Sequence, residues 1–224
     1  MREIVLDTET TGLDPKSGHR IVEIGCVELI NHVATSVTYH QYINPERDMP
    51  AEAFRVHGLS EEFLGAQPVF SEISEEFLTF IGDSPLIIHN AEFDMGFINA
   101  ELERLKLGRL DMNRGIDTVR MARKRFPGAP ANLDALCKRF QIDNSNRELH
   151  GALLDARLLA DVYLELTGGR QQGLELANAS THMNAGPQVS ATAREPRTHE
   201  PNPEEEAAHQ AFIEKLDEPI WLKN

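Results

Sequence analysis

Two carboxylates stand two residues apart at the end of a short apolar run. Asp7 and Glu9 follow residues 4–6, whose Ile, Val and Leu side chains are typical of a buried strand. In an extended chain, residues i and i+2 point to the same side, so both acids converge at one end of the strand. Like charges at close range repel unless a cation lies between them. The pair is therefore a candidate metal site, although two acids that simply face water beyond a strand would give the same pattern.

A third acid, Asp94, ends the segment HNAEFD at residues 89–94. This segment follows the apolar residues 86–88, which we expect to form a buried strand, and it begins an amphipathic helix predicted over residues 92–107. Ligand sites in open α/β sheets gather at such strand ends. Acids are also common in the first turn of a helix because the helix dipole favours them. Asp94 is thus either a simple first-turn acid or a further ligand.

A histidine and a fourth acid lie five residues apart in HGALLD, residues 150–155. On one helix, His150 and Asp155 would be roughly 140° apart at about 100° per residue, so they would not share a face. We expect Asp155 to lie on a helix over residues 153–166 and His150 to lie in a mobile loop just before it. An imidazole with a pKa of about 6.5 can take a proton from water at neutral pH. An ordinary surface histidine is the alternative, since the chain holds nine.

Taken together, these residues predict a site for hard divalent cations, with Mg²⁺ or Mn²⁺ favoured over zinc because the ligands are oxygens. Two such ions about 3.5–4 Å apart can bind the attacking and leaving oxygens of a phosphodiester. The residues alone therefore predict a metal-dependent phosphoryl hydrolase. The sequence holds no Walker A loop, GxGxxG, GxSxG or HExxH pattern. The candidate site consists of Asp7, Glu9, Asp94, His150 and Asp155.

The elements that must position these residues form a mixed α/β pattern. Strands are predicted first, at residues 4–6, 20–30 and 33–43, and the last two form an antiparallel hairpin around the turn at Asn31 and His32. A strand at 86–88 and several helices follow. This order predicts a mixed sheet with helices packed on it. The helices are expected at residues 70–81, 92–107, 117–126, 132–140 and 153–166, with Asp117 and Asn132 as N-caps.

Composition bounds the class of protein. The chain has 224 residues, of which 41% are hydrophobic, which suits one compact domain with an appendage and excludes global disorder. No run of about 18 apolar residues occurs, so no membrane span is expected. The N-terminus becomes acidic too early for a signal peptide. Cys26 and Cys137 form no CxxC pair, so neither a disulfide scaffold nor a zinc-thiolate site is expected. A cytoplasmic location fits these features.

The charge balance limits how the chain can act on nucleic acid. The sequence has 22 Lys and Arg against 36 Asp and Glu, for a net charge of −14. A free-standing, non-specific DNA-binding protein usually presents a basic surface, because neutralisation of phosphates drives its affinity. An acidic protein can still act on nucleic acid if bound divalent metals supply positive charge or if a partner delivers the substrate.

The composition changes after Gly169. Residues 177–206 are rich in small and polar residues, which is typical of a flexible linker. Large apolar residues return only at the end, among them Phe212 and Trp221. A fraying terminus is one interpretation. A tethered peptide that docks on a partner is the other, and the only Trp of the chain favours it because Trp is enriched at interface hot spots.

The three motifs also resemble a known family. The segments DTETTG at 7–12, HNAEFD at 89–94 and HGALLDA at 150–156 are similar, in order and spacing, to the motifs of the DEDDh (DnaQ-like) 3′→5′ exonucleases. The resemblance spans residues 3–167 and implies a ribonuclease-H-like fold, with a mixed five-stranded sheet flanked by helices. It implies that His150 is the general base and that two metal ions are held by Asp7, Glu9, Asp94 and Asp155.

The family resemblance further implies a pocket for the 3′-terminal nucleotide, with Leu13 wedged between the last two bases. Apolar wedges and aromatic faces hold single-stranded ends without reading their sequence. For Leu13, Val56 and Phe93, ordinary core packing fits the pattern equally well. The implied pocket residues are Thr10, Thr11, Gly12, Leu13, Val56, His57, Asn90 and Phe93.

Within the family, the chain most resembles the exonucleases that proofread for bacterial replicative DNA polymerases, which implies DNA with single-stranded or frayed 3′ ends as substrate. The tail is similar too. A QxxLxL pattern formed by Gln171, Leu174 and Leu176 resembles a sliding-clamp-binding motif, and the final segment with Phe212 and Trp221 resembles one that binds the polymerase catalytic subunit. The predicted organisation is an exonuclease domain at 1–169, a flexible linker at 170–203 and a docking segment at 204–224.

Two alternative functions remain open. One is an RNA-processing member of the same family, although such enzymes generally lack this linker and tail. The other is a non-catalytic scaffold between clamp and polymerase, which the five intact site positions disfavour. The proofreading interpretation explains the acidic charge, because a tethered subunit gains a high effective concentration of primer ends. Mismatched ends also cost less to unpair, which gives selectivity without base readout.

Overall fold

The computed structural model describes residues 1–145, 149–169 and 201–215. The chain divides into two compact units, Met1–Leu174 and Glu175–Asn224. The first unit holds the sheet and the helices α1 to α7, and the described part of the second holds helix α8, Pro203–Ile213. Within the described ranges, no helix combines the length and the apolar character that a membrane crossing requires.

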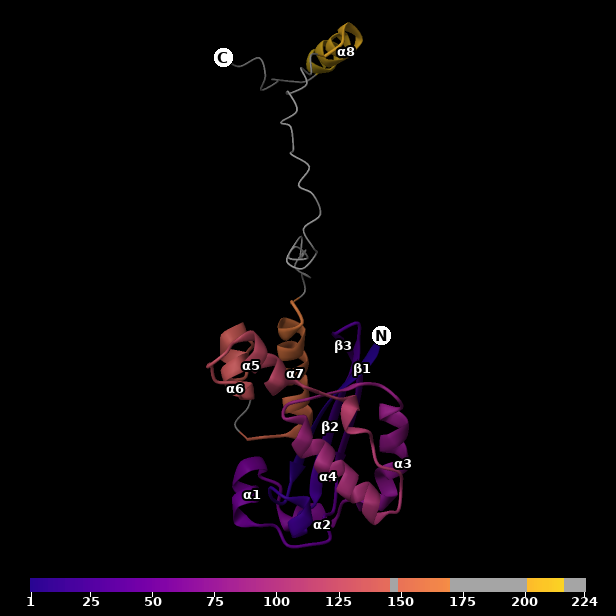
Figure 1. The fold of residues 1–224 in the computed structure, drawn as a ribbon, viewed down its shortest axis with the longest axis vertical. Helices are drawn as coiled ribbons and strands as arrows, with labels where there is room; N and C mark the ends of the chain where they lie inside the picture. The colour runs from indigo at the N-terminus through magenta and orange to yellow at the C-terminus, as the bar shows by residue number, and fades with distance from the viewer. Residues whose placement is uncertain (146–148, 170–200, 216–224) are drawn as a thin grey trace, which may run out of the picture. The chain divides into compact units, whose positions relative to one another are not determined.

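A five-stranded mixed sheet lies at the centre of the first unit (Figure 1). The strand order is β3-β2-β1-β4-β5. The central strand β1 is antiparallel to β2 and parallel to β4, and β5 is parallel to β4. This confirms the predicted mixed sheet. The strands are β1 Arg2–Thr10, β2 Ile21–Ile30, β3 Val33–Tyr42, β4 Leu86–Ile88 and β5 Gly115–Asp117.

The hairpin between β2 and β3 was expected from the turn residues and is present. Its two loop residues, Asn31 and His32, have φ values of 52° and 68°. Positive φ at both positions is the signature of the two-residue turn whose twist matches that of the flanking strands. The antiparallel register then pairs Ile30 with Val33 directly across the turn.

Two hydrophobic cores cover the two faces of the sheet, because successive strand residues point to opposite sides. Ile4 and Leu6 of β1 pack with the residues of α3, Phe70–Ile81, and α4, Ala91–Arg104. Val5 packs on the other face, with the helices that lie on the opposite side of the sheet in Figure 1. These are α5 Thr118–Arg125, α6 Leu133–Phe140 and α7 Ala152–Leu166. The layering leaves the end of β1 between both sets of helices.

The helix boundaries follow from local chemistry. Asp117 caps α5 by accepting from the backbone N–H groups of Val119 and Arg120, and Asn132 caps α6 by accepting from that of Ala135. Both caps were predicted. The expected helix over 92–107 ends earlier, at Arg104, because Lys106 adopts a left-handed φ of 58° and turns the chain.

The unpredicted elements of the first unit include one short strand and two short α-helices. Strand β5 has only three residues, and its pattern alone carries no strand signal. The helices α1, Ala51–His57, and α2, Glu61–Gly65, are short, with seven and five residues. Helices of this length are marginal by themselves, so their formation depends on tertiary contacts rather than on local propensity.

Candidate metal-dependent active site

The five predicted site residues meet at one cavity of about 250 Å³. The acids come from the end of β1, the first turn of α4 and the first turn of α7, and the histidine comes from the loop before α7. Segments that lie far apart in the sequence thus converge where the central strand ends. The cavity is lined by Asp7, Thr8, Glu9, His89, Phe93, Asp94, Asn132, Leu133, Asp134, His150 and Asp155.

Asp94 is fixed to β1 by hydrogen bonds from Thr8. The backbone N–H and the hydroxyl of Thr8 donate to the same Oδ1 of Asp94, at 3.0 and 2.7 Å. Asp94 is only 3% exposed. These bonds lock the start of α4 against the strand that carries Asp7 and Glu9. Sequence reasoning missed Thr8, since its partner is 86 residues away.

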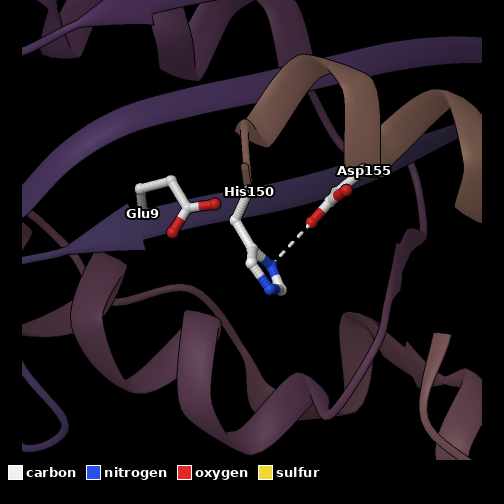
Figure 2. Close-up of side chains that lie close together, drawn as sticks. All are labelled: Glu9, His150 and Asp155. Carbon is white, nitrogen blue, oxygen red and sulfur yellow. Dashed lines mark hydrogen bonds and ion pairs between the residues drawn. The ribbon is translucent and has the colours of Figure 1, made fainter. Parts of the chain in front are cut away.

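His150 lies just ahead of α7, as predicted, and its ring faces the acid of that helix. Nδ1 of His150 is 3.2 Å from Oδ2 of Asp155, and the backbone N–H of His150 donates to the carbonyl of Val56. Figure 2 shows the imidazole between the carboxylates of Glu9 and Asp155. One ligand atom from each of these three residues lies within 4.8 Å of the other two. The imidazole therefore lies directly beside two of the carboxylates that could hold an ion.

The approach of α7 to the sheet depends on Gly25. Gly25 pairs with Asp7 across β1 and β2. A Cβ atom at this position would overlap the backbone nitrogen of Leu153 and the backbone carbonyl of Ala152. Only glycine allows the first turn of α7 to lie this close, and that turn carries Asp155. The sequence offered no signal for this close approach, since Gly25 reads as an ordinary strand glycine.

The carboxylates of the acidic cavity lie close together, and their charges raise one another's pKa values. Burial raises the pKa of Asp7 well above its usual value, and the nearby charges of Asp94, Glu9 and Asp155 raise it further. Burial also raises the pKa of Asp94 to about 7, against the opposing effect of the hydrogen bonds from Thr8. Of the described residues that line the cavity, none is Lys or Arg. Oxygen ligands with one imidazole, short of positive charge, fit hard divalent cations such as Mg²⁺ or Mn²⁺.

A second cavity of about 490 Å³ adjoins the first and shares Thr8, Glu9 and Phe93 with it. Leu13 is 84% exposed and Val56 is 46% exposed, so neither is a core residue. Phe93 is half-buried and packs on the core beside Phe97. Burial lowers the pKa of His57. Residues predicted for the nucleotide pocket that line this cavity are Thr10, Thr11, Gly12, Leu13, Val56, His57 and Phe93.

Asn90, which was also predicted for the nucleotide pocket, does not line this second cavity. It precedes α4 with a left-handed φ of 77° and lines a third cavity, together with Arg120 and Arg123. Of the predicted partner-binding residues, Phe212 lies on α8 and is 58% exposed. Gln171, Leu174, Leu176 and Trp221 lie outside the described residues.

Sequence comparison gives relatives that match this chain over nearly its full length. DNA polymerase III subunit epsilon of Rickettsia felis is 54% identical over 222 residues, which cover 96% of this chain and 97% of that protein. The protein of the same name from Escherichia coli K12 is 43% identical, with 95% and 92% covered. Among families, the chain matches the one described as Exonuclease, RNase_T, over residues 4–163.

Solved structures agree on the fold. The nuclease domain of 3′hExo, a DEDDh family member bound to rAMP, aligns with a TM-score of 0.63 at 17% identity, covering 74% of this chain and 90% of that one. Exonuclease X in complex with 5′ overhanging duplex DNA aligns with a TM-score of 0.57 at 24% identity, covering 73% and 90%. The expected ribonuclease-H-like fold is confirmed. The chain belongs to the RNase_T exonuclease family, whose members include the DnaQ-like DEDDh exonucleases.

Proposed function

We propose that this chain is the proofreading 3′→5′ exonuclease subunit of a bacterial DNA polymerase III. It would hydrolyse the terminal phosphodiester of single-stranded or frayed 3′ DNA ends. The observation that carries the proposal is the convergence of four acids and one histidine on one cavity. The near full-length similarity to proteins named DNA polymerase III subunit epsilon supports the replicative setting.

Two divalent cations, Mg²⁺ or Mn²⁺, would be held by Asp7, Glu9, Asp94 and Asp155. When bound, such ions supply positive charge for the attacking and leaving oxygens of a phosphodiester. The protein contributes the placement of the ligands. Thr8 fixes Asp94, the tight contact at Gly25 fixes the turn that carries Asp155, and the strand itself fixes Asp7 and Glu9.

We assign the removal of a proton from the attacking water to His150. Its contact with Asp155 holds the imidazole over the cavity, and the backbone bond to Val56 anchors the loop. The side chain is 47% exposed, so the proton can pass on to solvent.

The adjoining cavity would take the terminal nucleotide. Leu13 and Val56 present apolar surface to it, and Phe93 connects it to the acidic cavity. Apolar contacts and stacking accept any base, which suits an enzyme that must remove any misinserted nucleotide. Selectivity for mismatched ends would come from the lower cost of unpairing them.

The partners follow from the same proposal. The segment 204–224 would dock on the polymerase catalytic subunit, and α8, with its exposed Phe212, belongs to this segment. The QxxLxL pattern at 171–176 would bind the sliding clamp. We propose the division into an exonuclease domain at 1–169, a linker at 170–203 and a docking segment at 204–224, working in the cytoplasm where bacterial DNA is replicated.

The direct test is Mg²⁺-dependent release of nucleotides from single-stranded DNA labelled at its 5′ end. The Asp7→Ala variant should lose this activity, and Asp83→Ala, which changes an exposed acid after α3, should retain it. Parallel assays on RNA of the same sequence separate proofreading from RNA processing. Faster degradation of RNA, or DNA degradation that persists in Asp7→Ala, would contradict the proposal.

A further inference from the structure

Positive charge is concentrated on one part of this acidic chain. Residues 118–140, which span α5 and α6, contain six of the 22 Lys and Arg residues. The only acid among these residues is Asp134. The net charge of the whole chain is −14, so this segment opposes the overall balance. The basic residues are Arg120, Arg123, Lys124, Arg125, Lys138 and Arg139.

Some of these side chains have structural roles. Arg125 donates to the backbone carbonyls of Glu165 and Leu166 at the end of α7, at 2.6 and 2.8 Å. The guanidinium of Arg139 lies 4.4 Å from the centre of the Phe126 ring. These contacts tie the two helices to each other and to α7. They do not explain Arg120 and Arg123.

Arg120 and Arg123 are exposed and line a cavity of about 470 Å³, which we call the basic cavity. Its other polar lining residues include Asn90 and Asn132, whose amides can donate hydrogen bonds. The basic cavity shares His89 and Asn132 with the acidic cavity that holds the candidate catalytic residues. The two cavities are therefore adjacent.

Two acids also line the basic cavity, and one of them is already engaged. Asp117 accepts hydrogen bonds from the backbone at the start of α5 and lies 3.7 Å from the guanidinium of Arg120. Glu92, in the first turn of α4, is the other. The Asp117 contact holds Arg120 beside the cavity, whereas Glu92 would oppose an anion bound there.

We propose that the basic cavity binds a backbone phosphate of the substrate strand, on the 5′ side of the phosphodiester that is cut. This rests on the proposed function. The acidic cavity adjoins the nucleotide cavity through Glu9 and Phe93, and it adjoins the basic cavity through His89 and Asn132. A polynucleotide has the matching order of groups: a terminal nucleoside, the scissile phosphate, and further phosphates. Arginine suits these further phosphates, because the planar guanidinium can donate two parallel hydrogen bonds to the oxygens of one phosphate.

The proposal predicts that loss of the two arginines affects the hydrolysis of an oligonucleotide but not that of a mononucleotide ester. The full chain is assayed with a single-stranded DNA oligonucleotide and with the p-nitrophenyl ester of thymidine 5′-monophosphate, which has no second phosphate. In an Arg120→Gln/Arg123→Gln variant, the KM for the oligonucleotide should rise about three- to tenfold, with kcat little changed and a shallower dependence on salt. Hydrolysis of the small ester should be unaffected.

The control removes two positive charges from the same helices outside the cavity. The Lys124→Ala/Lys138→Ala variant should leave the oligonucleotide KM within about twofold of the wild-type value, since distant exposed charges are largely screened. Glu92→Gln should lower that KM, because it removes the opposing charge. An unchanged KM in the arginine variant, an equal rise in the lysine variant, or a loss of small-ester hydrolysis would overturn the proposal.

A binding measurement keeps this test independent of the proposed reaction. Fluorescence anisotropy of a labelled oligonucleotide reports affinity for the full chain without divalent cations. The arginine variant should bind several-fold more weakly than the lysine variant. Equal affinities would reject the basic cavity even if hydrolysis were observed, whereas absent hydrolysis with the expected difference in affinity would reject only the catalytic function.

Discussion

Thr8 donates two hydrogen bonds to a single carboxylate oxygen of Asp94, one from its backbone and one from its hydroxyl. The bonds join the strand that carries two candidate ligands to the helix that carries a third. Residues that orient metal ligands in this way commonly change metal affinity when they are replaced. Thr8 is therefore a positioning residue for the site.

Replacing Thr8 by Val should weaken metal binding. The variant keeps the shape and the backbone donor but loses the hydroxyl, so Asp94 is less firmly oriented. We expect the concentration of Mn²⁺ needed for half-maximal activity to rise about tenfold or more. Thr38→Val, at an exposed position on β3, is the matched control and should show no rise. Equal metal requirements in both variants would remove Thr8 from this role.

Replacing His150 by Ala should lower kcat and spare metal binding. General base catalysis typically contributes about 10²–10⁴-fold, so the fall in kcat should lie in that range. The shift of Tm caused by Mn²⁺ should persist, because the four carboxylates remain. His209→Ala, at an exposed position on α8, should keep full activity. Activity within about threefold of the wild type in His150→Ala would assign the proton transfer to another group.

The buried acids predict an unusual dependence of stability on pH. Burial raises the pKa of Asp94 from 3.8 to about 7 and, with the neighbouring acids, raises that of Asp7 as well. Between about pH 4 and pH 7, the folded, metal-free chain therefore keeps protons on these acids that the unfolded chain has released. The acids contribute fully to the free energy of unfolding below about pH 4. That contribution falls as the pH rises through about 7. Asp7→Asn should raise the Tm of the metal-free chain by a few degrees at about pH 8 and by less at about pH 5.

Metal should reverse this trend. Because divalent cations bind the deprotonated carboxylates, the rise in Tm that Mn²⁺ causes should be larger at about pH 8 than at about pH 5. Asp7→Asn should lose most of that rise. Differential scanning calorimetry with and without metal measures both effects. A metal-free wild type whose Tm increases steadily between these pH values would contradict the account.

The close contact at Gly25 gives a paired test. Gly25→Ala should lower stability by about 1–3 kcal/mol, because the new Cβ overlaps the backbone of α7. The displaced helix carries Asp155, so activity should fall as well. Gly96 lies in α4, where a new Cβ would meet no atom within 4 Å apart from its chain neighbours and the backbone of its own helix. Gly96→Ala should instead stabilise the chain by about 0.5–1 kcal/mol. Chemical denaturation measures the free energy of unfolding of both variants. Equal stability changes in the two variants would contradict the role given to the Gly25 contact.

Much of the site could be predicted from local patterns. The sequence pattern predicts Asp7 and Glu9 just after a short strand, whereas β1 continues to Thr10 and both acids lie in its last four residues. Asp94 and Asp155 lie in the first turns of α4 and α7, close to where the pattern predicts them. The ends of neighbouring strands meet at one edge of a sheet, which explains why these acids also meet in space. The predicted loop position of His150 followed from helix periodicity alone.

The remaining features depend on contacts between distant segments. Thr8 was missed because its partner lies on another element, and Gly25 was missed because the constraint comes from the backbone of α7. Strand β5 is too short to show a pattern. The basic cavity joins residues of α4, α5 and the start of α6, and no local sequence window contains all of them.

Manganese binding tests the central claim most directly. Electron paramagnetic resonance can count the Mn²⁺ ions bound by the full chain. We predict two ions for the wild type and fewer for Asp7→Ala, with no change for Asp83→Ala. A wild type that binds no Mn²⁺, or an Asp7→Ala variant that binds as many ions as the wild type, would contradict the claim that these acids form a metal-dependent nuclease site.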